Sequence, residues 1–270
     1  MASVFKYYAP QDYNLDALIH QYFWFSKREY LNDPYDMNAQ IIETFPKFKD
    51  LLEKYGYDLD KTLNDFAICC FAQNNDSQYF WSHYADTFRG WCLEFDADSL
   101  VDIVETGVPN RLYDVLYIDE YPNFNDPSTE LTIKQFDNGD FVQKPIRALL
   151  HKEKDRENLF AYLLRVKQKE AWGAEKEKRL ILGNIHLLSQ KGKYDKGTGY
   201  QIPWKQNALK SIIMGNNISD SNKFVLEHIA QQLGITLQKA KPILTDRHFS
   251  IAVDTLSKKS KNRMSSCVDE

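Results

Sequence analysis

The 270-residue sequence contains only four cysteines, and two of them, Cys69 and Cys70, are adjacent. Four thiols with this spacing are too few for a disulfide framework, and they do not form the paired ligand motifs of a zinc site. The six histidines show no metal-ligand spacing either. We therefore expect a protein of the reducing cytoplasm that binds no metal.

Long apolar runs are also missing. No uninterrupted stretch approaches the roughly eighteen residues of a membrane-spanning helix, so we expect no membrane partner. The first residues lack the basic and apolar regions of a secretory signal. The formal net charge of −4 argues against broad electrostatic binding to nucleic acid but leaves a local basic patch open.

Three common catalytic motifs are absent as well. The sequence has no phosphate-binding loop, no Gly-x-Gly-x-x-Gly dinucleotide motif and no Gly-x-Ser-x-Gly nucleophile elbow. By elimination, any chemistry is metal-free and is carried by carboxylates, tyrosines and a histidine.

What the sequence does contain is ample material for a core. Hydrophobic residues make up 43% of the chain and aromatic residues 14%. Short apolar runs predict strands, and apolar residues recurring every three or four positions predict helices. Because the strands do not alternate regularly with long helices, we expect a single mixed α+β domain with several short strands and peripheral helices rather than a doubly wound sheet. This domain spans 1–256, and a disordered polar tail follows over 257–270.

The expected elements follow from these patterns. Strands are predicted over 4–8, 22–25, 67–71, 90–95, 112–118, 180–182, 185–187 and 209–215. Helices are predicted from an N-cap at Asn14, over 41–66, 79–85, 141–170, and over 220–233 with Gly234 as its cap. The Gly- and Lys-rich segment 189–201 is expected to be an exposed loop.

The most informative stretch is an acidic pair that runs into an apolar strand. If the strand already begins at Glu175, its period of two places Glu175, Glu177 and Arg179 on one face. Two carboxylates beside a guanidinium suit a site that holds a sugar hydroxyl and stabilises positive charge. The structural alternative is a solvated strand start with paired charges.

A second cluster is Trp81-Ser82-His83-Tyr84. One helical turn can present hydroxyl and imidazole groups to a ligand, with Trp81 as a flat wall; a structural histidine is the alternative. Trp81 and Trp172 are both expected to be buried. The turn at Asn32 and Asp33 supplies a further polar motif. Because such motifs are where ligand groups often lie, we expect one concave site lined by Asn32, Asp33, Trp81, His83, Tyr84 and Glu177.

Short motifs follow one another in a fixed order along the chain. They are Phe5-Lys-Tyr, Phe25-Ser, Asn32-Asp-Pro-Tyr-Asp36, Cys70-Phe, Asn75-Asp-Ser77, Trp81-Ser-His-Tyr-Ala85, Gly90, Glu94-Phe95 and Trp172-x-x-Glu-x-Glu-x-Arg179. This ordered set resembles a bacterial family of unknown function, domain family 2971, from about residue 4 to about residue 253. That family has no well-established activity.

The chain opens with a short predicted strand, a helix that begins with Asn-Leu, and a second strand that ends in an aromatic residue and Ser, and a glutamate stands late in the chain at a strand start. This layout is more distantly similar to ADP-ribosyltransferase folds, which have a split sheet and cleave the bond between ribose and nicotinamide. This resemblance implies that Glu177 is the catalytic glutamate, that Glu175 orients the acceptor, and that Ser26 at the end of the second strand lines the nicotinamide pocket. The first strand departs from the pattern, because Lys6, Tyr7 and Tyr8 stand where those folds carry a His or Arg.

The resulting hypothesis is an enzyme that uses NAD to modify a protein or nucleic acid, as a toxin or phage-defence effector. Two other classes stay open: a non-catalytic small-ligand-binding or sensor domain, and a metal-independent nuclease or hydrolase, against which the acidic charge weighs. The candidate catalytic residues are Glu177, Glu175 and His83, and the candidate NAD-binding residues are Tyr7, Ser26, Asn32, Asp33, Trp81, Tyr84 and Arg179.

Overall fold

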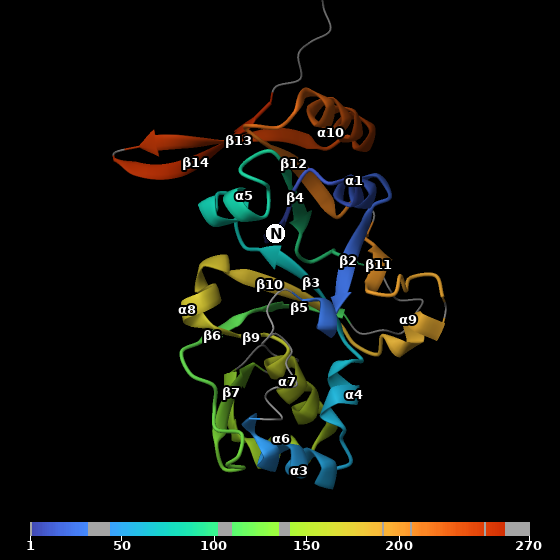
Figure 1. Cartoon of the computed structure of the whole chain (residues 1–270), viewed down its shortest axis with the longest axis vertical. Helices are drawn as coiled ribbons and strands as arrows, with labels where there is room; N and C mark the ends of the chain where they lie inside the picture. Colours follow the sequence, from blue (N-terminus) through green and yellow to red (C-terminus); the bar gives the residue numbers. More distant parts are fainter. Residues whose placement is uncertain are drawn as a thin grey trace, which may run out of the picture.

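The computed structural model describes residues 2–31, 44–101, 110–134, 141–190, 192–205, 207–245 and 247–256. Within these ranges the chain has the mixed α+β fold that the sequence predicts (Figure 1). The strands are β1 Ser3–Tyr8, β2 Tyr22–Lys27, β3 Ala67–Ala72, β4 Trp91–Asp96, β5 Asn110–Asp114, β6 Leu116–Ile118, β7 Glu130–Lys134, β8 Phe141–Pro145, β9 Val166–Gln168, β10 Glu177–Leu182, β11 Gly199–Pro203, β12 Leu209–Gly215, β13 Thr236–Thr245 and β14 His248–Thr255.

Helices flank the strands. They are α1 Asp12–Ile19, α3 Pro46–Lys54, α4 Leu59–Leu63, α5 Gln78–His83, α6 Ile146–Leu149, α7 Glu153–Leu163, α8 Lys169–Trp172, α9 His186–Gln190 and α10 Asp220–Leu233, with short 3-10 turns η1 Arg28–Tyr30 and η3 Gly173–Glu175. None of the helices in the described ranges is long and apolar enough to cross a bilayer.

A ten-stranded sheet organises the fold, and β3 lies at its branch point. Along one edge, β3 pairs with β10 over its whole length, and β10 pairs in turn with β5. Along the other edge, Ala67 and Ile68 pair with β2, whereas Ala72 at the opposite end pairs with Phe5 of β1. The strands β1 and β2 therefore share the same edge of β3 and separate between these contacts. Beyond β1, the order continues β4, β12, β13, β14.

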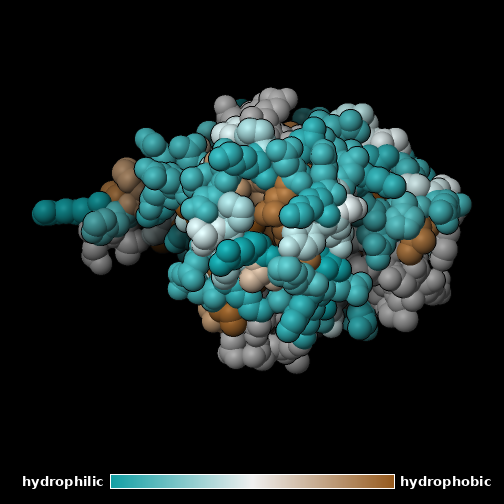
Figure 2. Space-filling model, turned by 90° about the horizontal axis from the view of Figure 1, so that it is seen from below, coloured by the Kyte–Doolittle hydropathy of each residue, from teal (hydrophilic) through white to brown (hydrophobic). Residues whose placement is uncertain are grey.

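Three apolar clusters hold the sheet and the helices together. One cluster contains Phe23, Phe95 and Trp204 and extends to α10, which covers β12 and β13 at the top of Figure 1. A second cluster, built around Phe48 and Phe124, joins α3, α6 and α7 at the opposite end. The third packs α5 against β1, β4 and β12. Viewed from the α3 end, the surface is mainly hydrophilic, with separate apolar patches (Figure 2).

Several predicted elements are confirmed. Helix α10 has the predicted bounds because Ser219 accepts a hydrogen bond from the Asn222 amide at its N-terminus and Gly234 takes the left-handed conformation, φ 67°, that ends it. By contrast, Asn14 is not an N-cap, since α1 already begins at Asp12. Its side-chain amide donates to the Ala9 carbonyl instead.

Other predicted boundaries are wrong. The expected helix over 141–170 is a strand, two helices, a strand and a third short helix, and Pro145, which lacks a backbone N–H, separates β8 from α6. The described part of 41–66 forms two helices separated by Gly56 at φ 81°. The expected strand 112–118 is divided between β5 and β6, 185–187 overlaps the helix α9, β11 starts within the expected loop, and the β13–β14 hairpin was not predicted. The predicted tail lies outside the described residues.

The two tryptophans expected to be buried differ in how far solvent reaches them. Trp81 is 0% exposed; it stacks on Phe88 with ring centroids 5.2 Å apart and donates its indole N–H to the Asn75 carbonyl at 2.7 Å. Trp172 is only partly buried and covers the Lys167 ammonium, which lies 4.3 Å from its ring centroid.

We expect Trp81→Ala to lower the free energy of unfolding by about 3–5 kcal/mol, the range for large-to-small changes in a packed core. Trp172→Ala should cost clearly less, because water already reaches part of that ring. Urea denaturation followed by circular dichroism measures both losses. Equal losses for the two variants would contradict the difference in packing.

Candidate functional site

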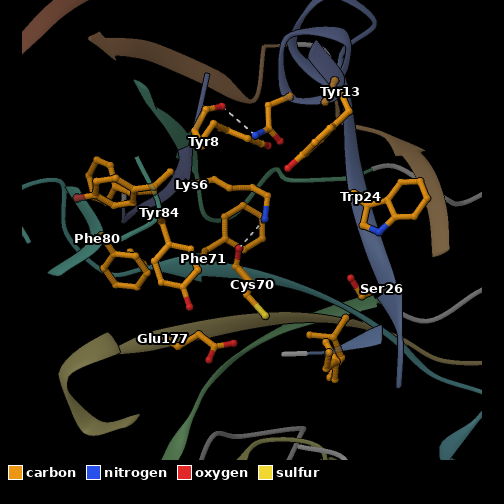
Figure 3. Close-up of a pocket in the computed structure, with 18 of the residues that line it drawn as sticks. Lys6, Tyr8, Tyr13, Trp24, Ser26, Cys70, Phe71, Phe80, Tyr84 and Glu177 are labelled. Atoms are coloured by element: carbon orange, nitrogen blue, oxygen red, sulfur yellow. Dashed lines mark hydrogen bonds between the residues drawn. The ribbon is translucent and has the colours of Figure 1, made fainter. Parts of the chain in front are cut away.

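A cavity of about 1010 Å³ opens where β1 and β2 separate from each other along β3. Residues of β1, α1, β2, β3 and α5 form its walls, and Glu175 and Glu177 lie at one end. Many of the walls are aromatic. Figure 3 shows Trp24 on one side and Phe80 and Tyr84 on the other, with Lys6 between them.

The branching of the sheet leaves this space between its strands. Backbone groups of β3 between its contacts with β2 and β1 have no strand partner on that edge within the described part of the chain. Such groups need other hydrogen-bond partners. The Cys70 carbonyl obtains one from the Lys6 ammonium at 2.9 Å, drawn as a dashed line in Figure 3.

The acidic pair is positioned by a turn followed by a strand. Glu175 ends the 3-10 turn η3, and Lys176 has the left-handed conformation, φ 44°, that turns the chain into β10. The strand therefore starts at Glu177, so the condition under which Glu175 would share a strand face with Glu177 is not met. From Glu177 onward the period of two holds, so that Glu177 and Arg179 share one face.

These side chains belong to a buried ion cluster of Glu175, Glu177, Lys167 and Arg179, all at most 3% exposed. The Lys167 ammonium donates to Glu175 Oε2 at 3.0 Å and to Glu177 Oε2 at 3.1 Å. The Arg179 Nε–H donates to Glu177 Oε1 at 2.8 Å, and another guanidinium nitrogen donates to the Leu164 carbonyl at 2.7 Å. Two cations thus neutralise two carboxylates, and their mutual attraction offsets the desolvation penalty of burying the four charges.

The cluster keeps Glu177 ionised. Burial by itself raises the pKa of its carboxyl, but the Arg179 and Lys167 cations outweigh that effect and lower the pKa below its ordinary value. At neutral pH the end of the cavity therefore carries a fixed carboxylate.

Helix α5 connects this cluster to the wall of the cavity. Ser77 caps the helix by accepting from the Phe80 amide, and Tyr84 follows the last helical turn. The Tyr84 hydroxyl donates to Glu175 Oε1 at 2.6 Å. The Tyr84 ring also packs on Phe80, with centroids 5.0 Å apart. An aromatic side chain is thus fixed beside the carboxylates.

The structure brings most of the predicted site residues together. The residues that line the cavity are Tyr7, Ser26, His83, Tyr84, Glu175 and Glu177. His83 is exposed, near Tyr79. Trp81 is not among the lining residues but lies in the core, and Arg179 lies behind Glu177. Asn32 and Asp33 lie outside the described residues.

Sequence reasoning missed several important residues. Lys167 was not a candidate, because it lies in the polar stretch Arg165-Val-Lys167-Gln-Lys-Glu170, which carries no local signal of burial. Lys6, Tyr13 and Trp24 line the cavity too, but no local pattern separates them from other strand and helix residues. Across the described ranges, no three or more His, Cys, Asp or Glu side chains group in a way that could hold a metal ion.

The site and the fold define a mixed α+β protein whose branched sheet encloses an aromatic cavity beside a buried ion cluster. Residues 80–180 match the sequence model of DUF2971, a family described as proteins of unknown function. This match confirms the predicted resemblance from α5 to β10, a segment that contains all four residues of the ion cluster. No curated protein and no solved structure gives a significant match.

We expect Glu177→Gln to lower the free energy of unfolding by about 3–5 kcal/mol at neutral pH, because Lys167 and Arg179 lose a buried counterion. The folded pKa of Glu177 is depressed, so its stabilisation is present above an unfolded pKa of about 4.3 and is lost as the pH falls toward the folded value. The variant should therefore show a weaker loss of stability in acid than the wild type.

Urea denaturation between neutral pH and about pH 3 measures both effects. Glu170→Gln is the matched control, since Glu170 is exposed on α8 and should change neither quantity. If Glu177→Gln has the same free energy of unfolding and the same pH dependence as the wild type, the ion cluster does not stabilise the fold.

Proposed function

We propose that this protein is an ADP-ribosyltransferase-like enzyme that uses NAD to modify a macromolecule. The observation that carries the proposal is the position of Glu177. It is the first residue of β10 and lines the cavity between the two strands that separate from β3. A late glutamate at a strand start, beside a divided sheet, is what the resemblance to ADP-ribosyltransferase folds implies.

The carboxylate of Glu177 has the charge that such a reaction needs. As the bond from ribose C1′ to nicotinamide breaks, its electron pair leaves with nicotinamide and positive charge develops on the ribose. A fixed anion stabilises that charge. A carboxylate offers about four acceptor positions. N–H groups of Arg179 and Lys167 occupy three of these positions and the Cys70 thiol also hydrogen-bonds to Glu177, so a ribose hydroxyl would take the place of that thiol.

The remaining residues take complementary roles. The walls formed by Trp24, Phe80 and Tyr84 suit stacking of flat heterocycles. The hydroxyl of Ser26, which also lines the cavity, is available to the nicotinamide group. The volume of about 1010 Å³ is at the upper end of small-molecule sites, as a dinucleotide requires.

Acceptor attack forms a new bond to ribose C1′ and releases the proton of the attacking group. Glu175 orients that group, and Tyr84 and Lys167 fix the Glu175 carboxylate by hydrogen bonds. His83 lies on the exposed part of the wall, where a macromolecule can approach, and is the proposed proton acceptor.

The second candidate is a small-ligand-binding domain without catalysis. One observation favours it: both carboxylates already have cationic partners, as a purely structural ion cluster also requires. The two functions differ in the fate of NAD, which an enzyme consumes and a binding domain leaves intact.

The test is incubation of the wild-type protein with NAD, alone and with a cell lysate, followed by chromatography for nicotinamide and by transfer of label from the adenine part of NAD. We expect nicotinamide release and labelled macromolecules. Glu177→Gln should lower the rate by about 100-fold or more. Glu175→Gln should be milder, and Glu170→Gln should match the wild type.

Because Glu177→Gln also weakens the fold, Glu177→Asp supplies a second variant. It retains a counterion for Arg179 and Lys167 but withdraws the carboxylate by one methylene, so activity should fall while the protein stays folded. If calorimetry detects NAD binding but NAD stays intact, the binding domain replaces the enzyme. If NAD neither binds nor reacts, both forms of the NAD proposal are wrong.

A further inference from the structure

The cavity contains a second lysine whose surroundings differ from those of Lys167. Lys6 extends from β1 into the middle of the cavity in Figure 3. Its ammonium donates to the Cys70 carbonyl at 2.9 Å and lies 5.8 Å and 5.4 Å from the ring centroids of Tyr8 and Phe71. These partners are a carbonyl dipole and two aromatic rings.

The charge of Lys6 is therefore not neutralised within the part of the chain that the structure describes. Lys167, in the same cavity, has two carboxylates at 3.0 and 3.1 Å. Lys6 has no carboxylate at ion-pair distance among the described residues. The cavity acids Glu175 and Glu177 already have cations, and Asp12 and Asp16 are exposed on α1, where solvent screens them. A half-buried ammonium without a counterion favours an anion beside it.

The surroundings indicate what kind of anion. Tyr13 and Ser26 add hydroxyl groups to the same cavity, and the aromatic walls suit a flat heterocycle. A ligand with both an anionic group and a heterocycle matches this combination. We propose that Lys6 is the anion-binding residue of the cavity and holds a phosphoryl group of a nucleotide. That this group is the diphosphate of NAD rests on the proposed function, whereas the phosphoryl site itself does not.

The test is calorimetry of the full chain at low salt with inorganic pyrophosphate, ADP, NAD and, as a ligand without phosphate, adenosine. We expect Lys6→Met to weaken binding of the three phosphorylated ligands by about 10- to 100-fold, as for a lost hydrogen bond to a charged group. Adenosine binding should not change. Lys6→Arg should retain most of the affinity, and Lys205→Met, at an exposed turn, is the matched control.

Salt provides a second criterion. Pyrophosphate binding by the wild type should weaken as salt rises, and this dependence should be smaller in Lys6→Met. If that variant does not fold, protection of wild-type Lys6 from acetylation can be followed by mass spectrometry. Pyrophosphate and NAD should protect Lys6 but not Lys205.

The outcomes separate the two proposals. If the affinity for phosphorylated ligands depends on Lys6 but NAD stays intact, the phosphoryl site is supported and the transferase proposal is contradicted. If NAD is consumed but Lys6→Met binds the phosphorylated ligands as tightly as the wild type, the transferase proposal is supported and the Lys6 site is contradicted. Absence of binding of pyrophosphate, ADP and NAD to the wild type, or binding without protection of Lys6, would overturn the Lys6 assignment.

Discussion

The buried cluster of Lys167, Glu175, Glu177 and Arg179 is the interaction on which the rest of the site depends. Its two cations and two carboxylates come from β9, the turn η3 and β10, so it ties these elements together at one end of the cavity. Removing one member leaves an unpaired buried charge, which costs far more than losing a surface ion pair. The same cluster holds the Glu177 carboxylate ionised and immobile, and both are properties that an electrostatic catalyst needs.

The branching of the sheet provides the space beside this cluster. Because β2 and β1 pair with opposite ends of β3, part of one edge of β3 has no strand partner among the described residues, and side chains line the cavity there. Lys6 and Lys167 line the same cavity but have different partners. Lys167 is matched by two carboxylates, whereas Lys6 meets a carbonyl and aromatic rings. Lys167 thus belongs to the ion cluster, whereas Lys6 is the residue that we propose for binding an anion.

Local patterns predicted the elements whose signals lie within a few residues. The N-cap Ser219 and the left-handed Gly234 delimit α10, and the continuous apolar run of β3 marks a buried strand. The helix expected over 141–170 is wrong because the charged and apolar residues of this segment also satisfy a helical spacing. Its strands are instead fixed by pairing: β9 pairs with β6, which lies far back in the chain, and β8 pairs with the preceding strand β7. Such pairing is a tertiary choice that overrides local propensity.

The sequence by itself determined the mixed α+β class and identified Glu175, Glu177, His83 and Tyr84 as site candidates, because each stands in a short motif with an unusual combination of side chains. Only the tertiary structure decided their surroundings. It left Trp172 only partly buried over the Lys167 ammonium, placed Arg179 behind Glu177, and brought Lys6 and Lys167, which are far apart in the chain, to the same cavity. Burial and the choice of counterion depend on the whole packed sheet, and no local pattern encodes them.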